Sequence, residues 1–182
     1  MKTVCKRLLC ALSLVLLLAL PGLAADLENI LLLDLKDGRV AIQMRPDLAP
    51  KHVARIKELV REGFYDGLKF HRVISGFMAQ TGDLTGTGMS GSGQNIPAEF
   101  SKAPFKRGTV GMARSQDVNS GDSQFFICFE PAPYLDGKYT VWGQVIKGMH
   151  FVDKIKKGKG QSGSVTDPDI IVKMQVAADA QK

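Results

Sequence analysis

Polar side chains lie among apolar ones in the segment 68–80, where the alternation of residue types predicts two β-strands. Counting by twos places Arg72 on one strand face with three apolar residues, Leu68, Phe70 and Ile74. If Ser75-Gly76 makes a tight turn, Gln80 lies roughly opposite Arg72 on the second strand. An arginine in this setting belongs either to a binding surface or to a structural ion pair.

A third segment carries the same mixture of side chains. Gln124, Phe126 and Cys128 share one face of a predicted strand, and Met78 shares a face with Gln80. Together the three strands would present an arginine, two glutamines, a methionine and a phenylalanine. This combination is too polar for a core and too apolar for ordinary surface. The residues alone leave both interpretations of the arginine open.

The glycine-rich stretch at residues 81–94 contains G-x-G-x-x-G, the dinucleotide-binding spacing, at Gly86, Gly88 and Gly91. Such a site needs a helix that begins directly after the glycines, because the helix N-terminus holds the pyrophosphate. The residues after Gly91 have no helical spacing of apolar side chains and soon reach Pro97. No acidic residue for the ribose follows about twenty positions later. We therefore interpret the stretch as a surface loop.

Other chemistries lack their usual sequence patterns. Three histidines, His52, His71 and His150, are far apart and lack metal-ligand spacing, so no metal site is expected. The run from Gly88 to Ser92 lacks the last glycine of a serine-hydrolase elbow. Cys128 falls in an apolar strand, which predicts an inert buried thiol.

Periodicity and turn signals predict the elements that position these residues. Strands are expected at residues 30–35, 39–44, 68–74, 77–82, 109–114, 123–129, 139–146 and 169–177. One helix is expected at residues 50–62, because Pro50 suits a first turn and Gly63 a helix end, and a second at 149–157. Closure removes exposed strand edges, so we predict a mainly β fold, a closed eight-stranded antiparallel barrel capped by two helices.

The segment FHRVISGFMAQTGD, residues 70–83, closely resembles the signature of the cyclophilins, which are peptidyl-prolyl cis/trans isomerases. SQFFICF at 123–129 and YLDGKYTVWGQV at 134–145 are similar to two further motifs of the family, in the same order. The resemblance extends from residue 27 to residue 176. It implies that the glycines of residues 81–94 shape one wall of a peptide groove.

The resemblance implies a role for each matching residue. Arg72 is the catalytic arginine, and Gln80 orients it. The proline pocket is walled by Phe77, Met78, Phe126, Leu135 and Tyr139, the last in place of the family's common histidine. The peptide backbone is held by Gln124 and by the edge Met112, Ala113 and Arg114. Tyr134 stands at the groove rim, where many eukaryotic members have tryptophan, so we expect weak cyclosporin binding.

The implied activity is rotation of X-Pro bonds in polypeptides, without a covalent intermediate, metal or cofactor. The alternative is a non-catalytic proline-peptide binding module or holdase chaperone on the same fold. The expected partners are proline-containing polypeptides, and a monomer is expected. The formal charge of +6 includes three basic residues near the N-terminus. The remaining excess is too small to indicate a nucleic-acid partner.

Residues 1–24 have the three parts of a secretory signal peptide, and the resemblance implies that residues 25–182 are a cyclophilin-like isomerase domain. Basic residues precede an apolar run at 8–20, and Gly22 and Ala24 suit the positions before a cleavage site. An uncleaved anchor is the alternative, although the run is short for a bilayer. Cleavage would remove Cys5 and Cys10 and leave Cys128 alone. We therefore expect a protein of the periplasm, with secretion as the alternative, and no stable membrane insertion after cleavage.

Overall fold

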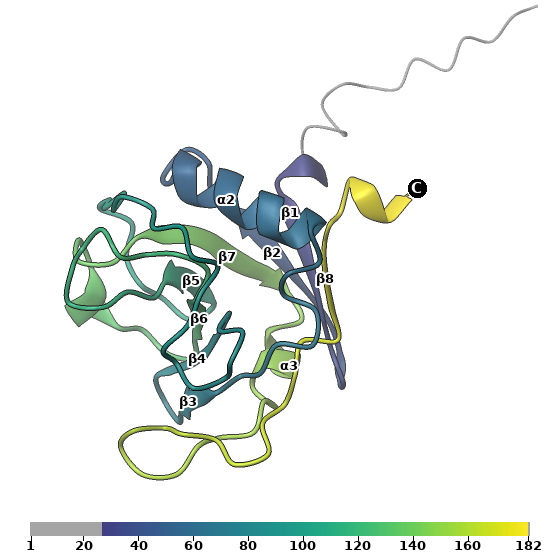
Figure 1. The fold of residues 1–182 in the computed structure, drawn as a ribbon, viewed down its shortest axis with the longest axis vertical. Coiled ribbons are helices and arrows are strands. Elements are labelled where there is room, and N and C mark those ends of the chain that lie inside the picture. The colour runs from purple at the N-terminus through teal and green to yellow at the C-terminus, as the bar shows by residue number, and fades with distance from the viewer. Residues whose placement is uncertain (1–26, 182) are drawn as a thin grey trace, which may run out of the picture.

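The computed structural model describes residues 27–181 and contains one sheet of eight antiparallel strands (Figure 1). The strands are β1 (Ile30–Leu35), β2 (Gly38–Met44), β3 (Arg72–Ile74), β4 (Met78–Thr81), β5 (Thr109–Met112), β6 (Phe125–Cys128), β7 (Val141–Lys147) and β8 (Lys173–Val176). Their order in the sheet is β3-β4-β6-β5-β7-β2-β1-β8. The mainly β, antiparallel prediction is confirmed.

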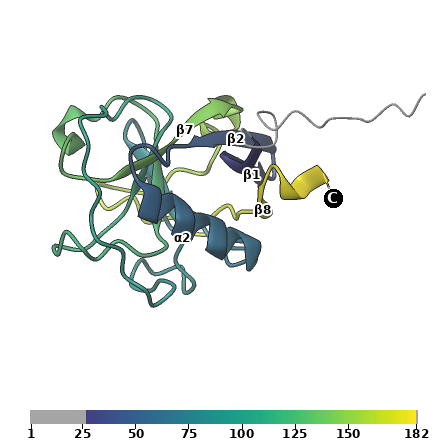
Figure 2. The same ribbon diagram turned by 90° about the horizontal axis from the view of Figure 1, so that it is seen from above.

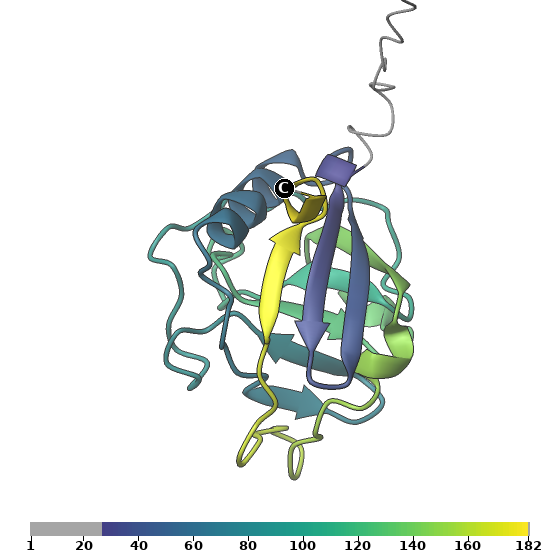
Figure 3. The ribbon, with the colours of Figure 1, turned by 90° about the vertical axis from the view of Figure 1, so that its right-hand side faces the viewer.

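The sheet is a curled half-barrel and not the closed barrel that the sequence analysis predicted. In Figure 3, β1, β2 and β8 stand upright while the teal strands around β3 to β6 run across the view. Within residues 27–181 the edge strands β3 and β8 form no ladder with each other. Only isolated bridges such as Lys69 to Ile170 link the irregular segments beside them. These two edge strands are short, with three residues in β3 and four in β8.

The core fills the concave side of this sheet. Buried and partly exposed residues alternate along β1 and β2, as expected for a hairpin with one apolar face. The largest fully buried side chains include Trp142, Tyr65, Phe70 and Phe125. Tyr65 also donates its hydroxyl to the backbone oxygen of Ser123 over 2.9 Å. Because this core is closely packed, the sheet is a rigid support for the side chains that do not face the core.

Helix α2 (Pro50–Arg61) packs against β7 and β8, and Figure 2 shows it at one end of the sheet beside β8. Its apolar stripe buries Val53, Ile56, Leu59 and Val60, as the spacing predicted. The residue before the helix makes no side-chain cap. Instead the Glu99 carboxylate accepts the backbone N–H groups of Lys51 and His52, at 3.1 and 3.0 Å. A residue from a distant loop thus accepts two backbone N–H groups of the first turn, which have no partner within the helix.

The second helix is shorter than predicted. α3 (Met149–Val152) stops after four residues, whereas the sequence analysis extended it to residue 157. The α-helical hydrogen bonds end at Asp153, because Lys154 and Ile155 donate to the carbonyl groups three residues back, those of Phe151 and Val152. The backbone N–H of Lys156 is bound by the Asp169 carboxylate over 2.8 Å. Two short 3-10 helices, η1 (Pro133–Leu135) and η2 (Asp179–Gln181), were not predicted. None of the helices in residues 27–181 is long and apolar enough to cross a membrane.

Candidate active site

The register of three strands brings the predicted polar residues together. Arg72 on β3 lies opposite Gln80 on β4, and Gln80 lies opposite Phe126 on β6. The turn between β3 and β4 contains Gly76 at φ +71°, a conformation that glycine adopts without strain. The expected alignment across the Ser75-Gly76 turn is therefore confirmed. It makes one continuous surface from residues that are far apart in the sequence.

A chain of hydrogen bonds connects the arginine to the glycine-rich loop. Arg72 Nη1 donates to Gln80 Oε1 over 3.1 Å, and Gln80 Nε2 donates to Gln124 Oε1 over 2.9 Å. Gln124 Nε2 then donates to the backbone oxygens of Gly88 and Ser90, at 3.1 and 2.7 Å. Each amide uses its oxygen toward the arginine side and its nitrogen toward the loop. The two glutamines thus form a directed relay.

The acceptors of Arg72 are neutral. Besides Gln80, the backbone oxygen of Ser162 accepts from Arg72 Nε over 3.1 Å. Within residues 27–181 no ion pair involves Arg72, so the structural ion pair considered for it is not formed by this part of the chain. A guanidinium has five N–H donors, and two of them have these protein acceptors. The other three have no acceptor among residues 27–181, so this part of the chain leaves them available to a ligand.

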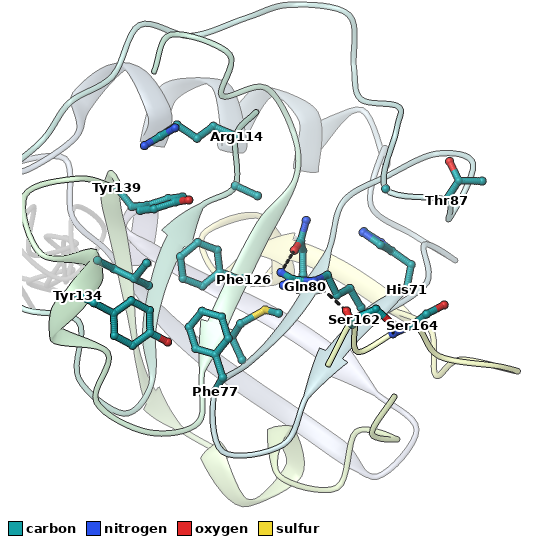
Figure 4. A pocket seen from close by; sticks show the side chains of 15 residues that line it. His71, Phe77, Gln80, Thr87, Arg114, Phe126, Tyr134, Tyr139, Ser162 and Ser164 are labelled. Carbon is teal, nitrogen blue, oxygen red and sulfur yellow. Dashed lines mark hydrogen bonds between the residues drawn. The ribbon is translucent and has the colours of Figure 1, made fainter. Parts of the chain in front are cut away.

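A cavity of about 700 Å³ lies beside the arginine. Figure 4 shows aromatic side chains along one side and polar side chains along the other. Ten of the residues predicted for the site line it: Arg72, Phe77, Met78, Gln80, Ala113, Arg114, Phe126, Tyr134, Leu135 and Tyr139. An apolar space beside a fixed cation has the size and composition of a small-ligand site.

Packing fixes the aromatic side of the cavity. Phe126 stacks on Phe105 with ring centroids 5.8 Å apart and meets the Tyr139 ring edge-on at 6.0 Å. Met78, Phe126 and Leu135 are buried, with at most 7% of each residue exposed. Tyr134, in contrast, is 57% exposed and leans on Phe77 at the rim. The cavity therefore has a rigid apolar floor and an accessible edge.

Arg114 holds the upper end of the aromatic side. Its guanidinium carbon lies 4.5 Å from the centroid of the Tyr139 ring. Its nitrogens donate to the backbone oxygens of Ser115 and Lys138, at 2.8 and 3.1 Å. Because Lys138 directly precedes Tyr139, these bonds fix the tyrosine at the cavity. Arg114 also adds a second positive charge to the cavity lining.

Two predicted site residues do not line this cavity. Gln124 lines a neighbouring cavity of about 440 Å³, together with residues of the glycine-rich loop such as Met89 and Ser90. Met112 lines neither cavity, because its side chain is buried in the main core, where only 2% of the residue is exposed. Its neighbour Ala113 turns to the other side and reaches both cavities. A contact of Met112 with a peptide could therefore involve only its backbone, and the role of the edge formed by Met112, Ala113 and Arg114 stays a prediction.

The glycine-rich loop, residues 81–94, forms part of the wall of both cavities. As expected, no helix follows it. The Asp83 carboxylate accepts the backbone N–H groups of Thr85 and Gly88. Burial raises the pKa of Asp83, but these hydrogen bonds outweigh burial and bring the pKa below its ordinary value. The Asp122 carboxylate likewise accepts from the backbone of Ser92 and Gly93, at 3.0 and 2.8 Å. Carboxylates therefore anchor the loop at both ends.

Five further residues line the larger cavity. Gly88 belongs to the glycine-rich loop that was expected there, whereas the sequence analysis missed His71, Thr87, Ser162 and Ser164. His71 directly precedes Arg72, so strict alternation would turn it away from the arginine. The chain at His71 is not regular strand, however, and burial there lowers the pKa of its imidazole. The two serines come from the segment after α3, which carries no sequence signal of a site.

Comparison with known proteins identifies the family. The model of the family described as cyclophilin type peptidyl-prolyl cis-trans isomerase/CLD matches residues 30–176. The chain belongs to the cyclophilin family. This cyclophilin is 58% identical over 172 residues to the probable peptidyl-prolyl cis-trans isomerase of Brucella suis biovar 1 (strain 1330), with 87% of each chain covered. It is also 42% identical to peptidyl-prolyl cis-trans isomerase B of Bacillus subtilis (strain 168), over 68% of this chain and 88% of the relative.

Solved cyclophilins have the same fold. The crystal structure of cyclophilin AquaCyp293 from Hirschia baltica matches with a TM-score of 0.76 and 29% identity, over 85% of this chain and 76% of that one. A cyclophilin-type isomerase of Cryptosporidium parvum, crystallised in the presence of the dipeptide Ala-Pro, matches with a TM-score of 0.74 and 28% identity. That match covers 81% of this chain and 98% of the other. This cyclophilin is a peptidyl-prolyl cis-trans isomerase.

Proposed function

We propose that this isomerase acts on X-Pro bonds of unfolded exported polypeptides and that Arg72 is its catalytic residue. The observation that carries the proposal is the state of the arginine. Its guanidinium is held at two points by neutral acceptors, and its remaining donors adjoin an apolar cavity. A guanidinium held in this orientation can donate a hydrogen bond to a substrate atom that enters the cavity.

An X-Pro bond resists rotation because the amide nitrogen shares its lone pair with the carbonyl, which gives a barrier of about 18–20 kcal/mol. At the twisted transition state the lone pair returns to nitrogen, which then accepts a hydrogen bond. A guanidinium N–H placed there stabilises the twisted state more than the planar one, and this difference accelerates the reaction. Arginine suits the task because it stays charged and its donors form a rigid plane.

The apolar side of the cavity supplies the grip that rotation requires. Met78, Phe126 and Leu135 form a buried floor that suits a pyrrolidine ring. Tyr139, braced by Arg114, closes one end. Holding the ring on this floor lets the preceding residue rotate past Arg72. The Ala-Pro dipeptide used with the Cryptosporidium parvum relative has the size expected for such a site.

A non-catalytic proline-peptide binding module or holdase on the same fold is the competing proposal for this chain. Binding alone requires the apolar floor but gives no reason to fix a cation beside it. The hydrogen bonds that connect Gln124, Gln80 and Arg72 hold the guanidinium in a fixed position beside the cavity. This feature favours catalysis.

Nuclear magnetic resonance exchange on a short X-Pro peptide tests the proposal. The wild type should accelerate exchange, and Arg72→Ala should lower the catalysed rate about 100-fold or more, the scale of losing one oriented donor. Phe126→Ala should instead weaken peptide binding, since it removes the floor. Full catalysis by a folded Arg72→Ala variant contradicts the role of the arginine. No catalysis by the wild type would favour the binding module.

We further propose that the chain is exported to the periplasm and acts there as a monomer. The signal peptide at residues 1–24 lies outside the described residues, and its three-part sequence supports the proposal. Mass spectrometry of the protein expressed in a bacterium should find an N-terminus at Ala25 or Asp26. A mature protein that keeps residues 1–20 would contradict cleavage and favour the anchored form.

A further inference from the structure

The segment 158–165 binds along the outer edge of β3, on the side opposite β4. Val73 donates its N–H to the Gly163 oxygen over 2.7 Å and accepts from Gly158 N over 2.9 Å. Val165 N donates to the His71 oxygen over 3.1 Å. The segment, called the docking loop below, therefore continues the hydrogen bonding of the sheet past its first strand.

Two glycines allow this close contact. A Cβ at Gly163 would lie 2.4 Å from Cγ1 of Ile74, and one at Gly158 would lie 1.9 Å from the Gly163 oxygen. Gly163 also has φ +70°, in the left-handed region that favours glycine. A side chain at Gly163 would therefore collide with β3, whereas one at Gly158 would collide with Gly163 inside the docking loop. Gly160, at φ +62°, has no atom within 4 Å of such a Cβ.

The docked position places one backbone oxygen beside the arginine. Ser162 is adjacent to Gly163, and its oxygen accepts from Arg72 Nε over 3.1 Å. Gln80 accepts from Nη1, so the two acceptors hold different parts of the guanidinium, as the dashed lines at Ser162 and Gln80 in Figure 4 mark. One bond alone would let the flat group swing about the remaining contact. Two bonds fix both its position and its plane.

We propose that the docking loop is a positioning element for the isomerase reaction. Gly158 and Gly163 seat it on β3, so that the Ser162 oxygen sets the orientation in which the free donors of Arg72 face the cavity. The inference rests on the catalytic role of Arg72 given above. It adds residues that do not act on the substrate but determine how well the arginine does so.

A matched pair of glycine variants tests the inference. Gly163→Ala and Gly160→Ala both place alanine at a positive φ, so each carries a similar backbone strain. Only Gly163→Ala collides with β3. We expect Gly163→Ala to lower kcat about tenfold, the effect of a modest loss of transition-state contact. KM should change little because the apolar floor is untouched, and Gly160→Ala should keep the wild-type kcat.

A spectroscopic reading separates positioning from a general loss of stability. The 1H–15N signal of the Arg72 Nε–H should exchange slowly with water in the wild type, because Ser162 accepts it. In Gly163→Ala this signal should shift and exchange faster, while Gly160→Ala leaves it unchanged. Equal kcat values for the two variants, or a kcat loss without a change in the Nε–H signal, would overturn the inference.

The wild-type measurement keeps the inference testable if Gly163→Ala does not fold. An Arg72 Nε–H that exchanges in the native protein as fast as in a free arginine would refute the Ser162 contact by itself. The activity of Arg72→Ala distinguishes the two levels of the argument. If Arg72→Ala retains full activity, the proposed catalytic role fails; if it is inactive while Gly163→Ala equals Gly160→Ala, only the docking loop inference fails.

Discussion

The substitution Gln80→Met measures how much of the activity depends on the orientation of the arginine. Methionine keeps the length of the side chain and most of its volume, but it removes the acceptor of Arg72 Nη1 and the donor to Gln124 Oε1. A hydrogen bond to a charged group contributes about 1.5–3 kcal/mol, which corresponds to about 10- to 150-fold in rate if it acts only in the transition state. Since the Ser162 oxygen still holds Nε, we expect a loss near the lower end, about tenfold in kcat.

The assay is exchange of a short X-Pro peptide over a range of peptide concentrations, which separates kcat from KM. Gln144→Met is the matched control. Gln144 also makes side-chain hydrogen bonds, accepting from Thr109 Oγ1 over 3.1 Å and donating to the Arg107 oxygen over 3.0 Å, but it does not line the cavity. The control should lose stability without losing kcat. A Gln80→Met variant with full kcat, or an equal kcat loss in both variants, would refute the reasoning.

Three further predictions concern the rim, the charge of the cavity and pH. Tyr134→Trp should tighten cyclosporin binding by enlarging the exposed rim, which calorimetry can check, and an unchanged affinity would place the contact elsewhere. Arg72 and Arg114 line the cavity, and none of the described residues that line it has a carboxylate. We therefore expect a higher kcat/KM for a peptide with Glu beside the X-Pro pair than for a peptide with Lys there, and high salt should reduce the difference. Equal kcat/KM values for the two peptides would contradict this prediction. Burial lowers the pKa of His52 and His71, so the unfolded chain binds more protons, and urea titrations should show stability decreasing below pH of about 6.5. A stability that is constant from pH 7.5 to pH 5 would disprove this.

Local patterns predicted the parts of the site that depend on strand register. The alternation around Arg72 and the Ser75-Gly76 turn were sufficient to place Gln80 opposite the arginine. The helix at Pro50 was also predictable, because its apolar spacing and its proline agree. These features depend on neighbours in the sequence. The family resemblance likewise rested on short stretches of sequence, namely three motifs that occur in the same order as in the family.

Features that depend on distant contacts could not be predicted. Beyond the end of α3, the Asp169 carboxylate binds the N–H of Lys156, a contact between distant residues that no local pattern indicates. The open form of the sheet depends on which strands lie at its edges, and no local pattern indicates that β3 and β8 do not pair. The side chain of Met112 enters the main core while its neighbour Ala113 faces the cavities, a difference that the resemblance alone did not indicate. The contribution of Ser162 depends on where residues 158–165 bind.

The hydrogen bonds along β3 have a consequence for solubility. An open sheet has two edge strands, and a free edge can pair with any extended chain, including the unfolded polypeptides on which an isomerase acts. Here Val73 has both its N–H and its oxygen occupied by residues 158 and 163. At the other edge, the Asp66 carboxylate accepts the N–H of Met174 over 2.8 Å. Because these groups are already satisfied, they are not available to pair with a further strand, which reduces the tendency of the two edges to start an aggregate.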